Sequence, residues 1–203
     1  MCTKNCFVTV DAEPISKGRW GEVWRGIWNG DEVAVKIFNT RDEASFLRET
    51  RIYCTTLMRH PNILVYYGHD TTSRYSCTQN WLVTQYHKRG SLYDYLNRPD
   101  LTLTWRQARR ILCSSLRGLV HLHTAIHGTQ AKLQIAHRDI KSKNILVKGD
   151  EFCEDANEEV TCVLADFGLA VTQGELPELV LTEDANTRVG TKRYMSPELL
   201  DLS

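Results

Sequence analysis

The stretch His137–Asn144 reads HRDIKSKN, and the apolar run Ile145–Val147 that follows it is typical of a short strand. Asp139 can accept the proton of an attacking hydroxyl group, and Asn144, five residues on, can hold a metal ion. A His-Arg-Asp triplet alone is weak evidence, because short motifs arise by chance. The motifs on either side therefore decide what the stretch does.

Two further motifs lie on the C-terminal side. The tripeptide DFG at residues 166–168 follows a strand that we expect over Val163–Ala165. A carboxylate at a strand end beside a glycine turn suits the coordination of Mg²⁺. The second motif, GTKRYMSPE, spans residues 190–198. Upstream of both, an acidic run over residues 150–159 is interpreted as a solvated loop.

On the N-terminal side, the sequence predicts strands joined by a hairpin. Asn29-Gly30-Asp31 is a strong turn signal between strands at Val23–Trp28 and Val33–Phe38. Alternation along the second strand places Ala34 and Lys36 on one face. The small Ala34 leaves room there for a flat ring over the sheet.

A carboxylate on an apolar helix stripe gives the next clue. A helix is expected over residues 42–59, and its stripe consists of Phe46, Glu49, Tyr53 and Leu57. A buried carboxylate needs a cationic partner, so we pair Glu49 with Lys36. The segment Ser16–Val23 carries glycines that let a backbone approach phosphates. We expect the Lys36 ammonium to face the same phosphates.

The remaining elements follow from periodicity and capping residues. Three further strands and one polar loop are expected: Val8–Val10, Ile63–Tyr67, Trp81–Tyr86 and the loop His69–Asn80. Ser91 is the expected N-cap of a short helix, Leu92–Leu96, and Thr104 of a long helix that ends near His123. The long helix is predicted to be a core element because its apolar residues recur at helical spacing. They are Trp105, Ala108, Leu112, Leu116, Leu119 and Leu122.

Taken in this order, the motifs resemble the protein-kinase family, and Lys141 resembles the serine/threonine branch, in which a lysine contacts the transferred phosphate. Five stretches look more specifically like type I receptors of the TGF-β/BMP superfamily: residues 18–26, 46–50, 90–96, 137–147 and 188–195. The resemblance covers the chain from about residue 15 to residue 203.

The resemblance implies an α+β, two-lobed protein-kinase fold that is truncated after the activation segment, with an incomplete C-lobe. Residues 1–86 would form the N-lobe, an antiparallel sheet plus one helix. Residues 87–203 would form a partial C-lobe with the hinge, a long helix, the catalytic loop and the activation segment. The chain stops five residues after Glu198, so we expect a fragment of a competent enzyme, with much apolar surface of the long helix exposed.

The implied reaction is transfer of the ATP γ-phosphoryl group to serine or threonine of a protein, with Mg²⁺ or Mn²⁺ as metal. Lys36 would position the phosphates, Glu49 would fix Lys36, and Asp139 would receive the proton. Lys141 would steady the transferring group, and Asn144 and Asp166 would hold the metal. The implied ATP-binding residues are Ile15, Ser16, Lys17, Gly18, Arg19, Trp20, Gly21, Glu22, Val23, Ala34, Lys36, Thr84, Gln85, His87, Asp94, Asn144 and Asp166.

The same resemblance implies partners and a location. The substrate would be a receptor-regulated Smad, selected in part by the loop Asp70–Gln79, and the partner a type II receptor kinase. The domain would lie on the cytoplasmic side of the plasma membrane, in a single-pass parent receptor whose span is absent from this chain. Thr182, Thr187 and Thr191 are candidate phosphorylation sites.

Departures from the family pattern keep two alternatives open. Ser16 stands where the family has its first loop glycine, which predicts weakened nucleotide binding, provided φ stays negative there. One alternative is therefore a pseudokinase that binds ATP without phosphoryl transfer. The early stop supports the other, a truncated module that only binds partners.

Composition excludes several other classes. The chain of 203 residues has 25 Lys+Arg and 25 Asp+Glu, so its net charge of zero gives no support to a nucleic-acid partner. No run of about 18 apolar residues is present to span a bilayer, and the first residues lack the apolar core of a signal peptide. The seven cysteines show no zinc pattern and are interpreted as reduced thiols.

Overall fold

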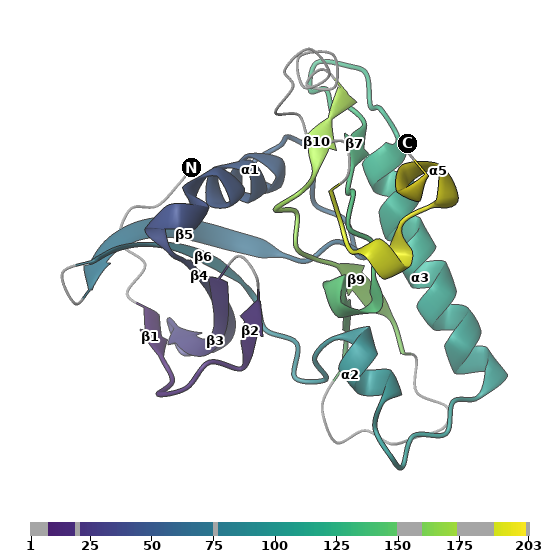
Figure 1. Cartoon of the computed structure of the whole chain (residues 1–203), viewed down its shortest axis with the longest axis horizontal. Helices are drawn as coiled ribbons and strands as arrows, with labels where there is room; N and C mark the ends of the chain where they lie inside the picture. Colours follow the sequence, from purple (N-terminus) through teal and green to yellow (C-terminus); the bar gives the residue numbers. More distant parts are fainter. Residues whose placement is uncertain (1–7, 19–20, 75–76, 150–159, 174–188, 202–203) are drawn as a thin grey trace.

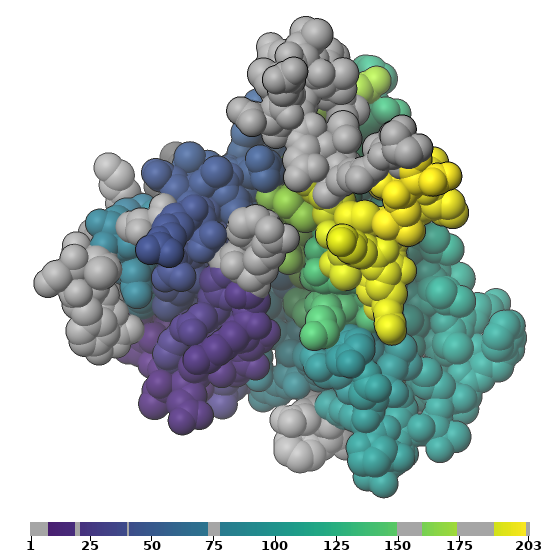
Figure 2. Space-filling model, in the orientation of Figure 1, coloured from purple at the N-terminus to yellow at the C-terminus, as the bar shows by residue number. Residues whose placement is uncertain are grey.

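The computed structural model describes residues 8–18, 21–74, 77–149, 160–173 and 189–201. An antiparallel sheet and one helix form one side of the molecule, and a mainly helical part forms the other (Figure 1). Figure 2 shows the sheet in purple and blue and the helical part in teal, with green segments between them. The α+β architecture expected from the sequence is present.

Six described strands form the sheet: β1 (Val8–Val10), β2 (Ser16–Gly18), β3 (Gly21–Trp28), β4 (Asp31–Phe38), β5 (Tyr66–Arg74) and β6 (Cys77–Gln85). Their order is β1-β3-β4-β6-β5, and β2 pairs with β3. The predicted hairpin between β3 and β4 is confirmed. Asn29 and Gly30 have φ values of 51° and 91°, the left-handed conformations that a two-residue turn of this kind requires.

Apolar residues cover both faces of the sheet. One face buries Val33, Val35 and Ile37 of β4, as alternation predicts, against partly buried tryptophans of β3 and β6. The other face carries Lys36 and the fully buried Phe38, and it packs on the helix that follows. The second face therefore places Lys36 between the sheet and that helix.

That helix is shorter than predicted. After a 3₁₀ turn, η1 (Thr40–Asp42), α1 spans Glu43–Tyr53 and ends at Cys54, whereas the sequence predicted a helix to residue 59. The β-branched Thr55 and Thr56 disfavour continuation, and Leu57 has a left-handed φ of 61°. Leu57 is consequently 39% exposed and leaves the predicted stripe.

The hairpin of β5 and β6 corrects a second prediction. Residues 69–80 were expected to be a polar loop between strands at Ile63–Tyr67 and Trp81–Tyr86, but both strands extend through most of that segment. Threonines at positions 71, 72 and 78 suit an extended backbone, and a hairpin in solvent needs no apolar alternation. Ile63 instead forms an isolated parallel bridge with Leu164.

The helical part contains short elements around one long helix. They are α2 (Leu92–Leu96), α3 (Trp105–His123), β7 (Ile135–Ala136), η2 (Ser142–Asn144), β8 (Ile145–Val147), β9 (Cys162–Leu164), β10 (Val171–Thr172), η4 (Lys192–Tyr194) and α5 (Pro197–Leu200). Antiparallel pairs join β8 to β9 and β7 to β10. The strand expected at Val163–Ala165 lies one residue earlier, as β9.

The predicted caps of α2 and α3 are confirmed. The Ser91 hydroxyl accepts the Asp94 N–H, and Thr104 and Gln107 form a reciprocal capping box. At the other end of α3, the buried ammonium of Lys132 donates to the carbonyls of Leu122, Thr124 and Leu133 at 3.1, 2.7 and 3.2 Å. A lysine that the sequence did not single out therefore satisfies the last carbonyls of this helix.

The packing of α3 corrects the prediction that its whole apolar series is core. Trp105, Leu112 and Leu116 are 81%, 59% and 57% exposed, which meets the expectation that apolar surface of this helix lies open. Leu122 of the predicted series is fully buried, and the other buried residues of the helix are Gln107, Ile111, Ser114 and Gly118. A Cβ on Gly118 would lie 2.5 Å from the Asn62 carbonyl oxygen. Within the described residues, no helix is both long and apolar enough to cross a bilayer.

Candidate active site

Three charged side chains from distant parts of the chain meet beside the sheet. The Lys36 Nζ of β4 lies 2.8 Å from Glu49 Oε2 of α1 and 2.7 Å from Asp166 Oδ1, two residues after β9. The ion pair between Lys36 and Glu49 that the sequence predicted is therefore present. The same ammonium also bonds a carboxylate in the expected metal-binding tripeptide.

Burial sets the electrostatics of this cluster. Burial alone would lower the pKa of Lys36, but the carboxylates of Glu49 and Asp166 outweigh it and raise that pKa above its ordinary value. Burial raises the pKa of Glu49, although Lys36 opposes the change. For Asp166 the attraction of Lys36 overcomes burial and lowers the pKa. Lys36 and Asp166 are therefore held in their charged forms.

The backbone around Asp166 is fixed by α1. Asp166 has a φ of 64°, uncommon for a residue with a side chain. The Phe167 N–H donates to Glu49 Oε1 at 3.2 Å, and Arg48 Nη1 donates to the Gly168 carbonyl at 2.9 Å. Helix α1 therefore holds both the lysine and the turn that carries Asp166.

The second cluster surrounds Asp139 on the segment between β7 and η2. Lys141 Nζ donates to Asp139 Oδ2 at 2.6 Å, and the Thr191 hydroxyl donates to Asp139 Oδ1 at 2.8 Å. Lys141 Nζ also lies 2.9 Å from the Thr191 oxygen. Sequence reasoning treated Thr191 only as a candidate phosphorylation site. It missed this contact because nothing local links residues 52 positions apart.

Asn144 completes this cluster and supplies one of the two expected metal ligands. Its side-chain nitrogen donates to the Asp139 carbonyl at 2.9 Å and to Asp139 Oδ2 at 3.1 Å, so its amide oxygen is the atom left for a cation. Asn144 and Asp166 are hard oxygen donors, which fit Mg²⁺ that takes its other ligands from phosphate and water. No group of three His, Cys, Asp or Glu suited to a metal occurs in the described part of the chain.

Aromatic rings connect the two clusters to the sheet. His137 packs on Phe167 with ring centroids 5.1 Å apart, Phe167 on Tyr53 at 5.1 Å, and Tyr53 on Tyr66 at 5.2 Å. His137 Nε2 also lies 3.0 Å from the Ala165 carbonyl oxygen. Burial lowers the pKa of His137, which keeps the ring neutral within this stack.

The proposed nucleotide-binding residues of the sheet share one face. The register places Val23 opposite Lys36, and Ala34 opposite the buried Thr84. The φ of Gly21 is 142°, and a Cβ there would lie 2.3 Å from the Ile37 carbonyl oxygen, so only glycine fits.

Other proposed nucleotide-binding residues lie around this face. Ile15 is 49% exposed, and the exposed Lys17 and Glu22 form an ion pair of 3.4 Å across the β2–β3 turn. Ser16 lies in β2 and keeps a negative φ, as expected, and Gly18 ends that strand. Arg19 and Trp20 lie outside the described residues.

The hinge that the resemblance implies would lie near Thr84–His87, at the end of β6. Gln85 donates its N–H to the Val65 carbonyl at 2.9 Å. His87 is 8% exposed, and burial, assisted by Lys148, lowers its pKa to about 4. Asp94 lies in the first turn of α2, where the Ser91 hydroxyl donates to its carboxylate at 2.6 Å.

A third charged cluster lies beside the hinge. Glu32 of β4 forms ion pairs with Arg25 of β3 and with Lys88, the latter at 2.8 Å. The Arg25 guanidinium also lies 6.0 Å from the Tyr86 ring centroid. The three side chains are 44%, 28% and 42% exposed for Arg25, Glu32 and Lys88, so solvent reaches all of them.

Comparisons with known proteins agree with these features. The family model described as "Protein kinase domain" matches residues 10–203. The chain is 53% identical over 189 residues to "Activin receptor type-1-like" of Mus musculus and of Homo sapiens, and to "Activin receptor type-1" of Homo sapiens. Each alignment covers 93% of this chain and 35% of the relative, so the chain spans about a third of their length. The resemblance to type I receptors inferred from the motifs is confirmed.

Proposed function

The chain belongs to the protein kinase domain family, and on this premise we propose that it transfers the γ-phosphoryl group of ATP to a serine or threonine hydroxyl of a protein. One observation carries the proposal. Lys36 is held between Glu49 and Asp166, while Asp139 and Lys141 both bond the hydroxyl group of Thr191. A base and a phosphate-binding cation are thus both positioned.

The contacts of Thr191 support the roles of Asp139 and Lys141. Its hydroxyl bonds a carboxylate oxygen and an ammonium at once, and a substrate hydroxyl needs the same two partners. As the substrate oxygen bonds the γ-phosphorus and the bond to ADP breaks, Asp139 takes the proton. Lys141 stabilises the negative charge on the transferring group. Lys36 orients the phosphates, and Glu49 fixes Lys36.

The oxygen donors of Asn144 and Asp166 would hold the divalent metal, Mg²⁺ or Mn²⁺. When bound, the metal neutralises phosphate charge. The chain's own contribution is to keep Asp166 ionised through Lys36 and to orient Asn144 through Asp139.

We further propose that the domain belongs to a receptor kinase, since the compared proteins are named activin receptors. The proposed substrate is a receptor-regulated Smad, and the proposed partner is a type II receptor kinase. The domain would act on the cytoplasmic side of the plasma membrane. The lobe boundary between residues 86 and 87 is part of the same proposal.

Single-turnover phosphorylation tests the proposal against both alternatives. We expect the chain, and a longer clone that contains it, to label a receptor-regulated Smad, and Asp139→Asn to abolish labelling while ATP still binds. Equal labelling by both forms would remove Asp139 as the base. ATP binding without labelling in the unmutated protein would indicate a pseudokinase. Absence of both ATP binding and labelling would indicate an interaction module.

A further inference from the structure

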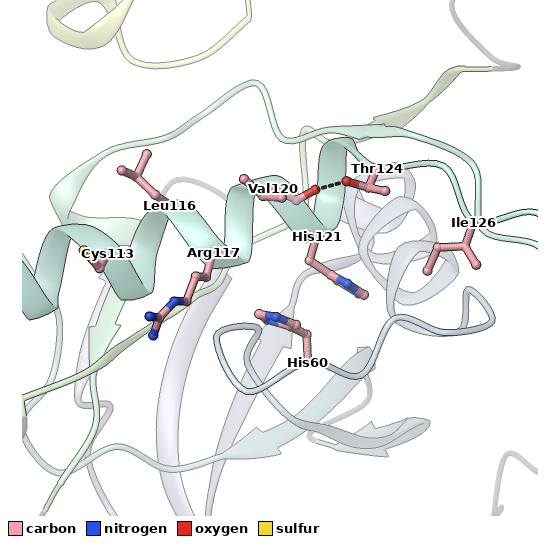
Figure 3. A pocket seen from close by; sticks show the side chains of 8 residues that line it. All are labelled: His60, Cys113, Leu116, Arg117, Val120, His121, Thr124 and Ile126. Carbon is pink, nitrogen blue, oxygen red and sulfur yellow. Dashed lines mark hydrogen bonds between the residues drawn. The ribbon is translucent and has the colours of Figure 1, made fainter.

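Two imidazole rings stack where the segment after α1 meets the end of α3. The rings of His60 and His121 have centroids 4.6 Å apart and planes 15° apart. Figure 3 shows His60 on the loop, pointing toward His121 on the helix, with Arg117 beside them. The pair lines a groove of about 490 Å³ that is separate from the lysine and aspartate clusters described above.

The backbone fixes the protonation state of His60. The Asn62 N–H lies 3.1 Å from His60 Nδ1. A backbone N–H can only donate, so Nδ1 must accept and cannot carry a proton. The structure therefore requires the neutral ring of His60, with its hydrogen on Nε2.

His121 is bound differently. Its Nε2 lies 3.0 Å from the Leu57 carbonyl oxygen, which can only accept, so Nε2 donates. Protonation of His121 at Nδ1 keeps this bond intact. Of the two stacked rings, only His60 loses a hydrogen bond when it gains a proton.

The charged groups around the pair oppose that proton. Arg117 of α3 lines the same groove, and the charge of Lys132 lowers the pKa of His121. Lys148 Nζ lies 3.4 Å from the carbonyl oxygen of Pro61, the residue after His60. No acidic residue is among the described residues that line the groove. Burial and the neighbouring ring lower the pKa of His60, which agrees with the geometry.

The segment held by His60 connects the site to the rest of the molecule. Asn62 donates its side-chain N–H to the Cys162 carbonyl at 2.9 Å, and its own carbonyl accepts the Leu164 N–H at 3.0 Å. These bonds tie the segment after α1, at residue 62, to β9, which precedes Asp166. The N–H that bonds His60 therefore belongs to the residue that joins this segment to β9.

We propose that His60 is a pH-sensitive clasp: protonation of its Nδ1 below neutral pH breaks the bond to the Asn62 amide and loosens the turn formed by residues 60–62. The proton comes from solvent, and no other bond is made or broken. Because the folded form disfavours the proton, the clasp is complete above the ordinary titration range of histidine and is lost as pH falls through it. The inference concerns the fold and does not depend on phosphoryl transfer.

Nitrogen NMR on the ¹⁵N-labelled 203-residue chain tests the proposal directly. At about pH 7.5, where histidine is largely neutral, the Nδ1 of His60 should show the chemical shift of an unprotonated acceptor. As the pH is lowered below the ordinary histidine pKa of about 6.5, that shift should move toward the protonated value. Hydrogen exchange at the Asn62 amide, corrected for intrinsic rates, should accelerate severalfold over the same range.

His60→Asn supplies a variant that does not titrate. An asparagine oxygen accepts from the N–H two residues on, so the bond survives at all pH values. The severalfold change at Asn62 should disappear in this variant. His123→Asn is the matched control, since His123 is exposed on α3, and it should keep the wild-type change.

Two results would overturn the clasp. One is a proton on His60 Nδ1 near neutral pH, and the other is an Asn62 amide that responds to pH equally in wild type and His60→Asn. If His60→Asn does not fold, the wild-type Nδ1 shift and Asn62 exchange decide, because loss of protection must follow the titration of that nitrogen.

Discussion

Two clusters of three charged side chains each include a residue of β4, and their charges are arranged in opposite ways. In one, the cation Lys36 is shared by two carboxylates, Glu49 and Asp166, and the side chains are 16%, 3% and 31% exposed. In the other, the carboxylate of Glu32 is shared by Arg25 and Lys88, and the side chains are 28%, 44% and 42% exposed. The first joins segments 130 residues apart, whereas the second joins neighbours of the sheet and hinge.

The difference separates function from surface chemistry. Removing charges from water costs several kcal/mol per ion, so a buried cluster is weak evidence for stability. Strongly shifted pKa values in a buried group of charges point to function instead. Exposed pairs are screened by solvent and contribute little. We therefore attribute the lysine cluster to the phosphates that we propose it faces. The Glu32 cluster needs no explanation other than ordinary pairing of charges on the surface.

The largest expected effect comes from Lys36→Met. The change leaves Glu49 and Asp166 as uncompensated charges, one of them almost fully buried, so we expect a loss of about 3–5 kcal/mol in the free energy of unfolding. Phosphoryl transfer should fall by a factor on the order of 10² or more, because the phosphates lose their cation. Urea unfolding and single-turnover labelling measure the two effects.

Lys88→Met is the matched control for this experiment, since it removes one lysine from the exposed cluster. If Lys88→Met destabilised the chain as much as Lys36→Met, burial would not be what distinguishes the two clusters. A double mutant of Lys36→Met with Glu49→Gln should lose less than the sum of the single changes, because no buried charge is then left unpaired at Glu49.

His87, two residues after β6, provides the next largest effect. Its pKa in the folded chain is about 4, against an ordinary value of 6.5. The lowered value means that stability is complete above pH 6.5 and is lost as the pH falls toward 4. The loss should approach about 3 kcal/mol, since one pKa unit corresponds to about 1.4 kcal/mol.

His87→Gln removes this titration. The unfolding free energy of wild type minus that of the variant, measured in urea at several pH values, should fall by about 3 kcal/mol as the pH falls from 6.5 to 4. Other buried histidines, such as His137, act equally on both proteins and cancel in the difference. A difference that is constant with pH would mean that His87 is charged, or accessible, in the fold.

Thr191 gives a third and smaller effect on a cluster of intermediate burial. Thr191→Val removes the hydroxyl between Asp139 and Lys141 but keeps the shape of the side chain. Hydrogen bonds to charged groups contribute about 1.5–3 kcal/mol, so labelling should fall by roughly one to two orders of magnitude. Thr191→Ser keeps the hydroxyl and should restore most activity. Equal losses in both variants would show that the methyl group matters instead.

The sequence allowed prediction of the lysine cluster because it contained a local contradiction. Glu49 lies on an apolar helix stripe, where a buried carboxylate is stable only beside a cation. The need for that cation led to the predicted pairing with Lys36. Thr191 offered no such contradiction, because a threonine side chain is stable in water and needs no buried partner. Its contact with Asp139 comes entirely from tertiary structure.

Strand and helix limits show the same contrast. Alternation located β4, where one face is buried, and capping residues located α2 and α3. The extension of β5 and β6 into residues 69–80 was missed because a strand in solvent carries no hydrophobic period. The end of α1 was missed because the left-handed φ of Leu57 has no signal in the sequence.

Glu32→Gln should have the smallest effect of all. The carboxylate and both of its partners are open to water, so we expect a melting temperature that cannot be distinguished from wild type. Added salt should change the variant and wild type equally, because little screened attraction is lost. The KM for ATP is the sharper readout, since Lys88 follows the hinge. An increase in this KM would mean that the exposed cluster holds the hinge in place, and the contrast between the two clusters would then be one of degree.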